Sequence, residues 1–194
     1  MDLKKTCLLL TSLSAFALPL PAPIMQQLPL KDASILTAAT SDFDHNGLKD
    51  YVVVLRYKDE ETNAMHRARN LFVYMQIQKG TFALLAQNAR VVLTLDDGGV
   101  GGDPFDYENG KGIAVNGTYF TVENAVAGGM HWTDYITFNY VPSVKNFVFH
   151  SRIFENWEAN PSEDPHAEAL VKTTHKETKA DPKKPILLPA YTPF

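Results

Sequence analysis

The chain of 194 residues has a single cysteine, Cys7, close to its N-terminus. With one thiol, neither an internal disulfide nor a multi-thiolate metal site can form, so the fold must depend on its core or on another kind of bound ion. Apolar runs long enough to span a bilayer are also missing. The apolar stretch from Cys7 to Ala17 is too short for this. We therefore expect no stable membrane insertion.

Familiar catalytic motifs are absent as well. The sequence has no Gly-x-Ser-x-Gly elbow, no His-Glu-x-x-His pair and no phosphate-cradling Gly-x-x-x-x-Gly-Lys loop. Its six histidines are scattered along the chain. The formal net charge of −4 argues against nucleic acid or anionic lipid as a partner. These absences favour a binding protein over an enzyme.

The N-terminus has the features of a secretory signal peptide. Lys4 and Lys5 precede the apolar stretch, and Ala15-Phe16-Ala17 has the small-x-small form of a cleavage site. We predict a signal peptide over residues 1–17, cleaved near Ala17, and a periplasmic or secreted protein; an uncleaved N-terminal anchor is the alternative. Cleavage would remove Cys7, two lysines and one aspartate, which shifts the formal charge from −4 to −5. A proline-rich leader, residues 18–33, would follow.

One segment has the pattern of a metal-binding loop. It reads Asp42-Phe43-Asp44-His45-Asn46-Gly47-Leu48-Lys49-Asp50, and an apolar run follows directly. Oxygen-bearing side chains alternate along it, and Gly47 permits the positive φ of a sharp turn. Calcium prefers roughly six to eight oxygen ligands, and the Leu48 carbonyl would supply one of them. The pattern predicts a calcium site with five ligand residues: Asp42, Asp44, Asn46, Leu48 and Asp50.

This loop does not fit an EF-hand, which needs a bidentate glutamate at position twelve, where the chain has Val53. It resembles instead the aspartate-rich calcium loops of integrin-type FG-GAP and VCBS repeats, which run directly into a β-strand. The stretches 71–77 and 79–82 resemble the strand, turn and second strand of such a unit. The resemblance covers about residues 35 to 86 and occurs once. It implies a single propeller-blade-like unit rather than a complete propeller.

An ordinary turn is the alternative interpretation of the loop, since Asp, Asn and Gly favour turns for conformational reasons. Three aspartates and one asparagine in strict alternation favour the metal. We expect a modest affinity of roughly 10⁻⁴–10⁻³ M, as in calcium modules that work outside the cytosol.

Short apolar and aromatic segments separated by turn residues predict an all-β fold. The strands are expected near residues 35–40, 51–57, 70–77, 81–87, 90–95, 113–116, 118–124, 134–141 and 146–153. Lys79-Gly80, Asn116-Gly117 and the Pro142-Ser143 region predict hairpin turns. Strands so close in sequence pair antiparallel, so we expect a meander over 34–154 that forms a sandwich or open barrel. The best helix candidate in this region, 60–69, is short and can simply be a loop.

The core of this β-domain should be largely aromatic. The side chains expected there are Phe72, Tyr74, Phe82, Phe120, Tyr135, Phe138, Tyr140, Phe147 and Phe149. After Glu155 the composition changes, since six of the twelve prolines follow it. We predict an irregular, polar, proline-rich tail over 155–194, with a short helix near 165–173. Two outcomes are open for its end: Ile186-Leu187-Leu188 and Tyr191 pack onto the sheet, or the segment stays mobile.

Two glycine-rich segments lie in the middle of the chain. They read Asp96-Asp97-Gly98-Gly99-Val100-Gly101-Gly102-Asp103-Pro104-Phe105 and Gly128-Gly129-Met130-His131-Trp132. With the metal-type loop, they resemble a group of uncharacterised exported bacterial proteins over residues 35 to 153. That group has an aromatic-Gly-Gly-Ser-x-Trp-Arg-Trp segment, whereas this chain has Ala127-Gly128-Gly129-Met130-His131-Trp132-Thr133-Asp134 and so lacks the arginine and the second tryptophan. The resemblance implies no established reaction.

These glycine-rich segments have two interpretations. At one end of the sheet they would form a recognition surface with Asp103, His131 and Trp132, because exposed loops commonly carry binding sites. Alternatively, they are tight connections between closely crossing strands, with Trp132 filling the core.

The sequence therefore favours an exported calcium-binding β-domain that acts by binding a protein or glycan partner, without catalysis. A periplasmic inhibitor or immunity-type protein is one alternative, because it suits a small exported domain without catalytic motifs. A carbohydrate-active hydrolase is another. It would need two carboxylates at a defined separation, which Asp97, Asp103, Asp106 and Glu108 could provide, with Asp97 and Asp103 as the first candidates.

Overall fold

The computed structural model describes residues 19–62, 67–105, 112–126 and 128–193. The predicted signal peptide and its cleavage site lie outside these ranges. Within them, no helix has both the length and the apolar character needed to cross a membrane.

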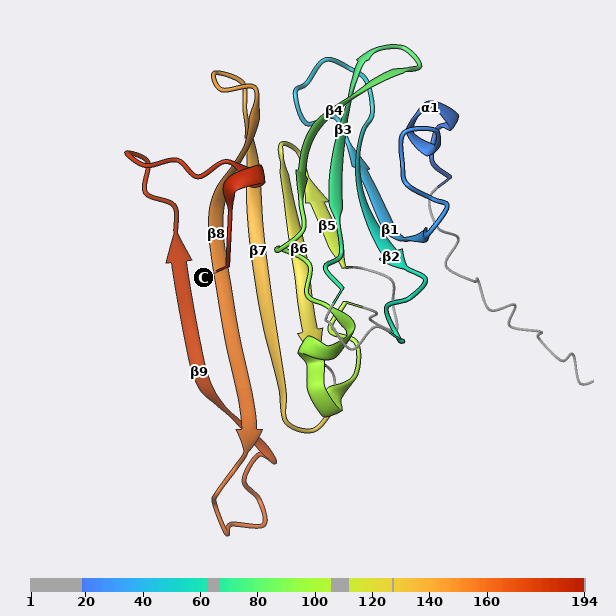
Figure 1. Cartoon of the computed structure of the whole chain (residues 1–194). Helices are drawn as coiled ribbons and strands as arrows, with labels where there is room; N and C mark the ends of the chain where they lie inside the picture. Colours follow the sequence, from blue (N-terminus) through green and yellow to red (C-terminus); the bar gives the residue numbers. More distant parts are fainter. Residues whose placement is uncertain (1–18, 63–66, 106–111, 127, 194) are drawn as a thin grey trace, which may run out of the picture.

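Two antiparallel sheets face each other (Figure 1). The four-stranded sheet has the order β1-β2-β3-β4, with β1 at Ala33–Ser41, β2 at Asp50–Tyr57, β3 at Leu71–Gln78 and β4 at Thr81–Asn88. The five-stranded sheet has the order β5-β6-β7-β8-β9, with β5 at Ile113–Asn116, β6 at Tyr119–Val126, β7 at His131–Val141, β8 at Asn146–Ala159 and β9 at Leu170–Lys179. Both sheets are meanders, so the predicted all-β sandwich is confirmed.

All three predicted hairpin turns are present. Gly80 and Gly117 have φ values of 79° and 57°, which a residue with a Cβ rarely adopts. They connect β3 to β4 and β5 to β6. The turn over Pro142–Lys145 connects β7 to β8. These turns fix the register of the long strands and thereby decide which side chains face inward.

The main core fills the space between the two sheets. Alternate residues of each strand point inward, and Phe120, Phe138 and Phe147 are completely buried there. Eight of the nine predicted core aromatics are buried. Tyr135 is the exception, because the even-numbered residues of β7 face the core and the odd-numbered ones face outward.

The four-stranded sheet is covered on its outer face as well. Residues 20–30, which include the short helix α1 (Ala22–Met25), bury Ile24 and Leu28 against Val53 and Phe72. A sheet covered on both faces favours continuous apolar strands, which explains the run Val52-Val53-Val54-Leu55. The segment predicted as a leader is therefore, from residue 20 onward, part of the fold.

The strand predicted at 90–95 is wrong. The Asn88 side chain accepts hydrogen bonds from the N–H groups of Arg90 and Val91, and Asn124 accepts one from Leu93. Two amide side chains thus take the place of a neighbouring strand, and a short 3₁₀ helix, η1 (Leu95–Gly101), follows. The candidate helix at 60–69 is not formed in its described residues either, which lie in a turn and in irregular structure.

The prediction of an irregular tail from residue 155 is also wrong. Strand β8 continues to Ala159, and β9 pairs with it over ten residues, so the helix near 165–173 does not form. Irregular structure is limited to the connection over 160–169 and to the end of the chain, from residue 180. There, Leu188 and Tyr191 are buried, whereas Ile186 and Leu187 are exposed.

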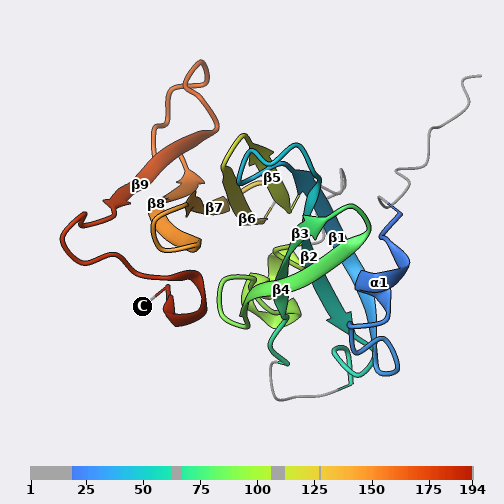
Figure 2. The same ribbon diagram turned by 90° about the horizontal axis from the view of Figure 1, so that it is seen from above.

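The C-terminal strap, residues 186–193, connects the two sheets. Its Leu187 bridges to Val148 of β8, and the Asn88 side chain of β4 donates hydrogen bonds to the carbonyls of Leu188 and Tyr191. On the opposite side of the sandwich, β1 lies beside β5, where Ser41 Oγ donates to the Gly117 carbonyl at 2.8 Å. Figure 2 shows the strap on the open side, next to β4.

Candidate metal centre

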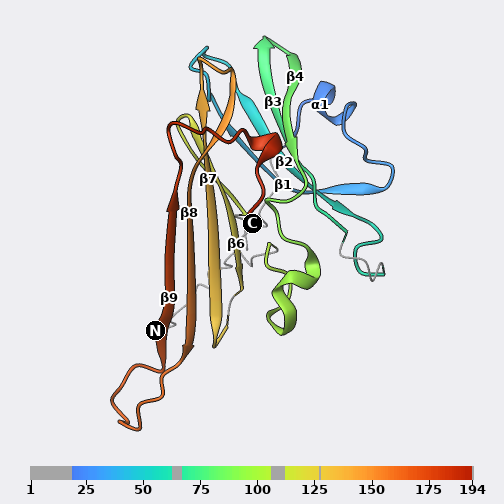
Figure 3. The ribbon, with the colours of Figure 1, turned by 60° about the vertical axis from the view of Figure 1, so that its left-hand side comes forward.

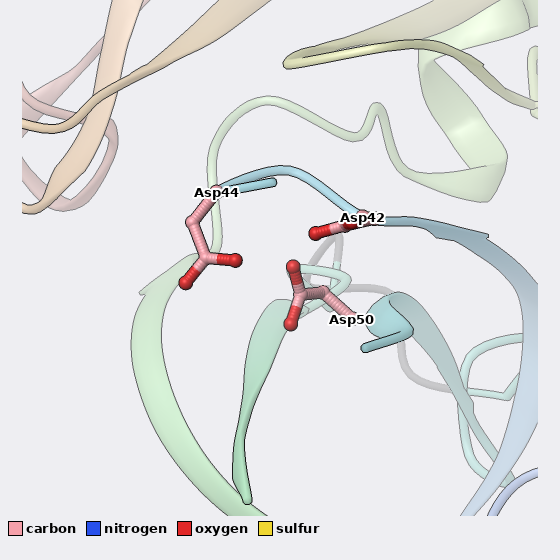
Figure 4. Close-up of side chains that lie close together, drawn as sticks. All are labelled: Asp42, Asp44 and Asp50. Atoms are coloured by element: carbon pink, nitrogen blue, oxygen red, sulfur yellow. The ribbon is translucent and has the colours of Figure 1, made fainter. Parts of the chain in front are cut away.

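Three carboxylates of the β1–β2 loop converge on one point. Asp42 and Asp44 belong to the loop, and Asp50 is the first residue of β2. One oxygen of each lies within 4.8 Å of the others (Figure 4). Carboxylate oxygens are the donors that hard divalent cations prefer. The described part of the chain therefore contains a cluster that can hold a metal ion.

Asp50 is the buried member of this carboxylate cluster, with 0% of its surface exposed. Its two oxygens accept the N–H groups of Phe43 and Gln76 at 3.0 and 2.8 Å. Burial raises the pKa of Asp50 to about 6; the two N–H bonds oppose this rise, and the charges of Asp44 and Asp42 add to it. The carboxylate thus joins the loop to β3 while its own negative charge stays poorly compensated.

The loop backbone bends so that the other two carboxylates face inward. Asp42 accepts the N–H groups of Asn46 and Gly47 at 3.0 and 2.9 Å, and Asp44 accepts that of Asn46 at 3.2 Å. Gly47 has a φ of 83°, as the sequence pattern requires, and His45 adopts a φ of 59°. Two left-handed residues within three positions explain the tight turn.

Phe43 anchors the loop to the core. It is fully buried, and its ring meets those of Phe147 and Phe120 edge-on at 5.0 and 6.3 Å. Because Asp42 and Asp44 flank Phe43, burial of its ring turns both neighbouring side chains the other way. Phe43 therefore faces away from the carboxylates.

Asn46, another predicted ligand, is placed differently. Asn46 uses its amide oxygen to accept the Leu48 N–H at 2.8 Å, and its amide nitrogen donates to Asp44 and to the Gln76 carbonyl. In this arrangement the Asn46 oxygen faces Leu48 rather than the carboxylates. The structure thus gathers the three carboxylates among the five predicted ligand residues and turns the Asn46 oxygen toward Leu48, while the role of the Leu48 carbonyl stays a prediction.

The carboxylate cluster receives no help from basic side chains. Among the described residues, no lysine, arginine or histidine forms an ion pair with Asp42, Asp44 or Asp50. Three like charges within 4.8 Å repel one another, and burial of Asp50 strengthens the repulsion. The donor set and its unbalanced charge both fit a divalent cation.

Asp103 lies in a second cluster, built around Arg69. The Arg69 guanidinium is fully buried and binds Asp103 through two hydrogen bonds of 2.6 Å and Glu60 through bonds of 2.8 and 2.5 Å. Arg56 contacts both carboxylates. Burial works against ionisation of Asp103, but hydrogen bonds from Arg69 and Phe105 and the charges of both arginines hold its pKa below the usual value.

Sequence reasoning missed this cluster because its members are up to 47 residues apart. Arg69, which lies just before the apolar strand β3, was the one sign of the cluster in the sequence, since a buried arginine needs acidic partners. Asp103, predicted as part of a recognition loop, instead joins the segment after η1 to the start of β3.

The other two residues of the predicted recognition surface point in opposite directions. His131 and Trp132 are neighbours on β7, so their side chains lie on opposite faces of the sheet. His131 stacks on Trp157 at 5.6 Å, whereas Trp132 stacks on Phe154 at 6.4 Å. The three residues therefore do not form one surface.

The carboxylates suggested for a hydrolase also occupy different surroundings. Asp97 caps η1 by accepting hydrogen bonds from the Thr94 N–H and hydroxyl, and it lines a cavity beside Trp132. Asp103 is held by Arg69 instead, with a lowered pKa that does not suit a general acid. Asp106 and Glu108, from the same segment, lie outside the described residues.

Comparisons of the chain with known protein families, with curated proteins and with solved structures found no match.

Proposed function

We propose that this protein is an exported calcium-binding β-domain that works by binding another macromolecule. The observation that carries the proposal is the uncompensated cluster of Asp42, Asp44 and Asp50. A divalent cation at its centre would replace the mutual repulsion of three carboxylates by attraction. No catalytic role is assigned to any residue.

Calcium is favoured over magnesium by the form of the loop. Its ligand residues are contributed by one short, irregular segment and the first residue of a strand, an arrangement that tolerates variable coordination number. Magnesium demands near-octahedral geometry and gives up its waters reluctantly. The resemblance of the loop to the calcium loops of FG-GAP and VCBS repeats supports the same choice.

The bound ion would fix one end of the sandwich. Asp50 already connects the loop to Gln76 of β3, and Phe43 connects it to the core. A cation held by Asp42, Asp44 and Asp50 would order the segment between these two anchors. Such an ion acts through folding stability and leaves recognition to other surfaces of the domain.

Thermal unfolding tests the metal proposal. In chelator-stripped protein, about 10 mM calcium is roughly 10 to 100 times the expected dissociation constant and should stabilise the fold by about 1.4–2.7 kcal/mol. For a domain of this size the melting temperature should rise by roughly 3–10 °C. The Asp44→Ala variant should lose this rise. The control Lys49→Ala changes an exposed residue of the same loop and should keep it.

An unchanged melting temperature of the wild-type protein across the calcium titration would contradict the proposal. An equal rise in Asp44→Ala would show that calcium acts at another place. Magnesium at the same concentration should give a smaller rise than calcium.

A further inference from the structure

Part of the inner face of the five-stranded sheet extends beyond the other sheet. Figure 3 shows β7, β8 and β9 extending beyond the four-stranded sheet, opposite the segment that carries η1. This region lies at the far end of the sandwich from the metal loop (Figure 1). The inner face therefore continues past the core as an open surface.

The register of β7 and β8 decides which side chains this surface carries. A bulge between Phe149 and Ser151 shifts the pairing, so that Arg152 and Phe154 lie opposite Ile136 and Asp134 on the inner face. Without the bulge, these two side chains would point outward. On β9, Lys176 and Thr178 pair with Phe154 and Arg152 and share their face.

The surface is hollowed into a groove with two lobes. The larger lobe has a volume of about 570 Å³ and lies between Trp132 and Phe154 on one side and residues 89–97 on the other. The smaller lobe, of about 350 Å³, lies over β8 and β9. Arg152 and Phe154 line both lobes, so they form one groove that runs across the strands. We call it the inner-face groove.

The floor of the inner-face groove combines aromatic and paired polar groups. The rings of Trp132 and Phe154 lie 28° from parallel, with their centroids 6.4 Å apart. Beside them, Arg152 binds both oxygens of Asp134 at 2.6 and 2.8 Å, and also the Pro193 carbonyl at 2.7 Å. The Arg152 and Asp134 side chains are 12% and 4% exposed, so the pair is held in place before any ligand arrives.

This lining disfavours three other classes of ligand. A purely apolar ligand would displace water from the polar groups of the groove, which include several threonines, and would offer no hydrogen bonds in exchange. A strongly charged ligand would find nearly balanced charges, since Arg90, Arg152 and Lys176 face Asp97 and Asp134. An extended peptide gains most by pairing with a strand edge, whereas this groove crosses the strands.

We propose that the inner-face groove binds a carbohydrate chain. Sugar rings have apolar C–H faces that stack on aromatic side chains, and hydroxyl groups that bond to polar side chains such as the exposed Thr174, Lys176 and Thr178 of the smaller lobe. The elongated, two-lobed shape suits several linked rings. This inference rests on the binding role proposed above and names its partner, but none of the contacts behind it involves the metal loop.

Tryptophan fluorescence makes the test specific. The chain has two tryptophans, Trp132 in the inner-face groove and Trp157 on the opposite face of the same sheet, against His131. In the Trp157→Phe variant, Trp132 is the only indole, and a sugar stacked on it should change its emission. The probes are a glycan array covering plant, animal and bacterial wall polysaccharides, followed by titration with soluble hexasaccharides of the glycans that bind.

The expected result is saturable binding that Trp132→Ala and Phe154→Ala each weaken about tenfold or more. The matched control Trp157→Ala should bind as the wild type does, and melting curves should show that all variants fold. Binding should be measured in calcium and in chelator, with Asp44→Ala included. Glycan binding without any calcium response would refute the metal proposal alone; a calcium response without glycan binding would refute the groove proposal alone.

Three other results would overturn the groove proposal. One is an array on which no glycan binds. Another is glycan binding that Trp157→Ala weakens and Trp132→Ala does not. The third is a peptide, or a second copy of this chain, that occupies the inner-face groove in place of sugar, seen as association that Trp132→Ala disrupts and glycans do not.

Discussion

Two acidic clusters in this protein deal with their charge in opposite ways. In the cluster around Arg69, Glu60 and Asp103 meet two arginines, and the pKa of Asp103 is lowered. In the carboxylate cluster of the β1–β2 loop, Asp42, Asp44 and Asp50 form no ion pair with a basic side chain among the described residues, and burial raises the pKa of Asp50 to about 6. The charges of the first cluster are balanced within the fold, whereas those of the second can be balanced by a proton or a cation.

The comparison shows how an acidic cluster neutralised within the fold differs from one that can hold a cation. Self-neutralised carboxylates have nothing left to offer a cation, although Asp103 lies in one of the most unusual segments of the sequence. Carboxylates that repel one another store unfavourable energy that a ligand can relieve. Charge balance, rather than the mere presence of acidic groups, therefore separates the two sites.

The largest effect should come from breaking the complete cluster. Arg69→Met leaves Glu60 and Asp103 buried beside too little positive charge, and should cost about 3–5 kcal/mol of unfolding free energy. Urea unfolding would measure it. As a control, Arg67→Met removes a more exposed arginine that pairs with Asp59, and should cost below about 1 kcal/mol. A cost for Arg69→Met as small as the control's would show that the cluster contributes little.

Asp44→Asn should lower the unfolding free energy in calcium but not in chelator. In chelator, removal of one of three like charges should leave the unfolding free energy unchanged or raise it by up to about 1 kcal/mol. In about 10 mM calcium, the variant should be less stable than the wild type by about 1.4–2.7 kcal/mol, because it lacks the calcium stabilisation. Paired urea titrations would measure both values. A substantial loss of stability in chelator would mean that Asp44 serves the fold without an ion.

The smallest effect is a difference in pH dependence. Because the folded-state pKa of Asp50 is raised, its stabilising contribution in metal-free protein is present below its usual pKa and is lost as the pH rises through about 6. Protons and calcium then compete for the same oxygens, so the stabilisation by calcium should shrink as the pH falls from about 7 to about 5.

Asp103 should behave in the opposite sense. Its lowered pKa means that its contribution is present above the usual pKa and is lost only as the pH falls through the lower value. In the wild-type protein, Asp103 should therefore contribute no change in stability between about pH 5 and about pH 7. Because Arg69→Met removes groups that lower this pKa and keeps the burial that raises it, the cost of the substitution should be smaller at about pH 5 than at about pH 7. Urea unfolding of both proteins across this range, with and without calcium, would show whether the two clusters titrate separately.

Local patterns in the sequence predicted what depends on neighbouring residues. The alternation of Asp42, Asp44 and Asn46, with Gly47 after it, forms a tight loop whatever the rest of the chain does. Hairpin turns at Gly80 and Gly117 are equally local. The burial of most core aromatics followed from the alternation of side chains along each strand. The prediction for Tyr135 was wrong because the sequence did not show which face of β7 is buried.

Features that depend on distant partners could not be predicted in this way. Strand β9 has polar residues on both faces, because it is an edge strand supported only by β8. Asn88 and Asn124 replaced a strand at 90–95 by side-chain hydrogen bonds. The inner-face groove depends on one bulge in β8, which places Arg152 and Phe154 on the inner face and which no sequence pattern predicts.

Isothermal titration of chelator-stripped protein with calcium tests the central claim most directly. The account predicts one calcium ion per chain, with a dissociation constant of roughly 10⁻⁴–10⁻³ M, and loss of this binding in Asp44→Ala but not in Lys49→Ala. No heat of binding in the wild-type protein, or binding of equal strength in Asp44→Ala, would contradict it.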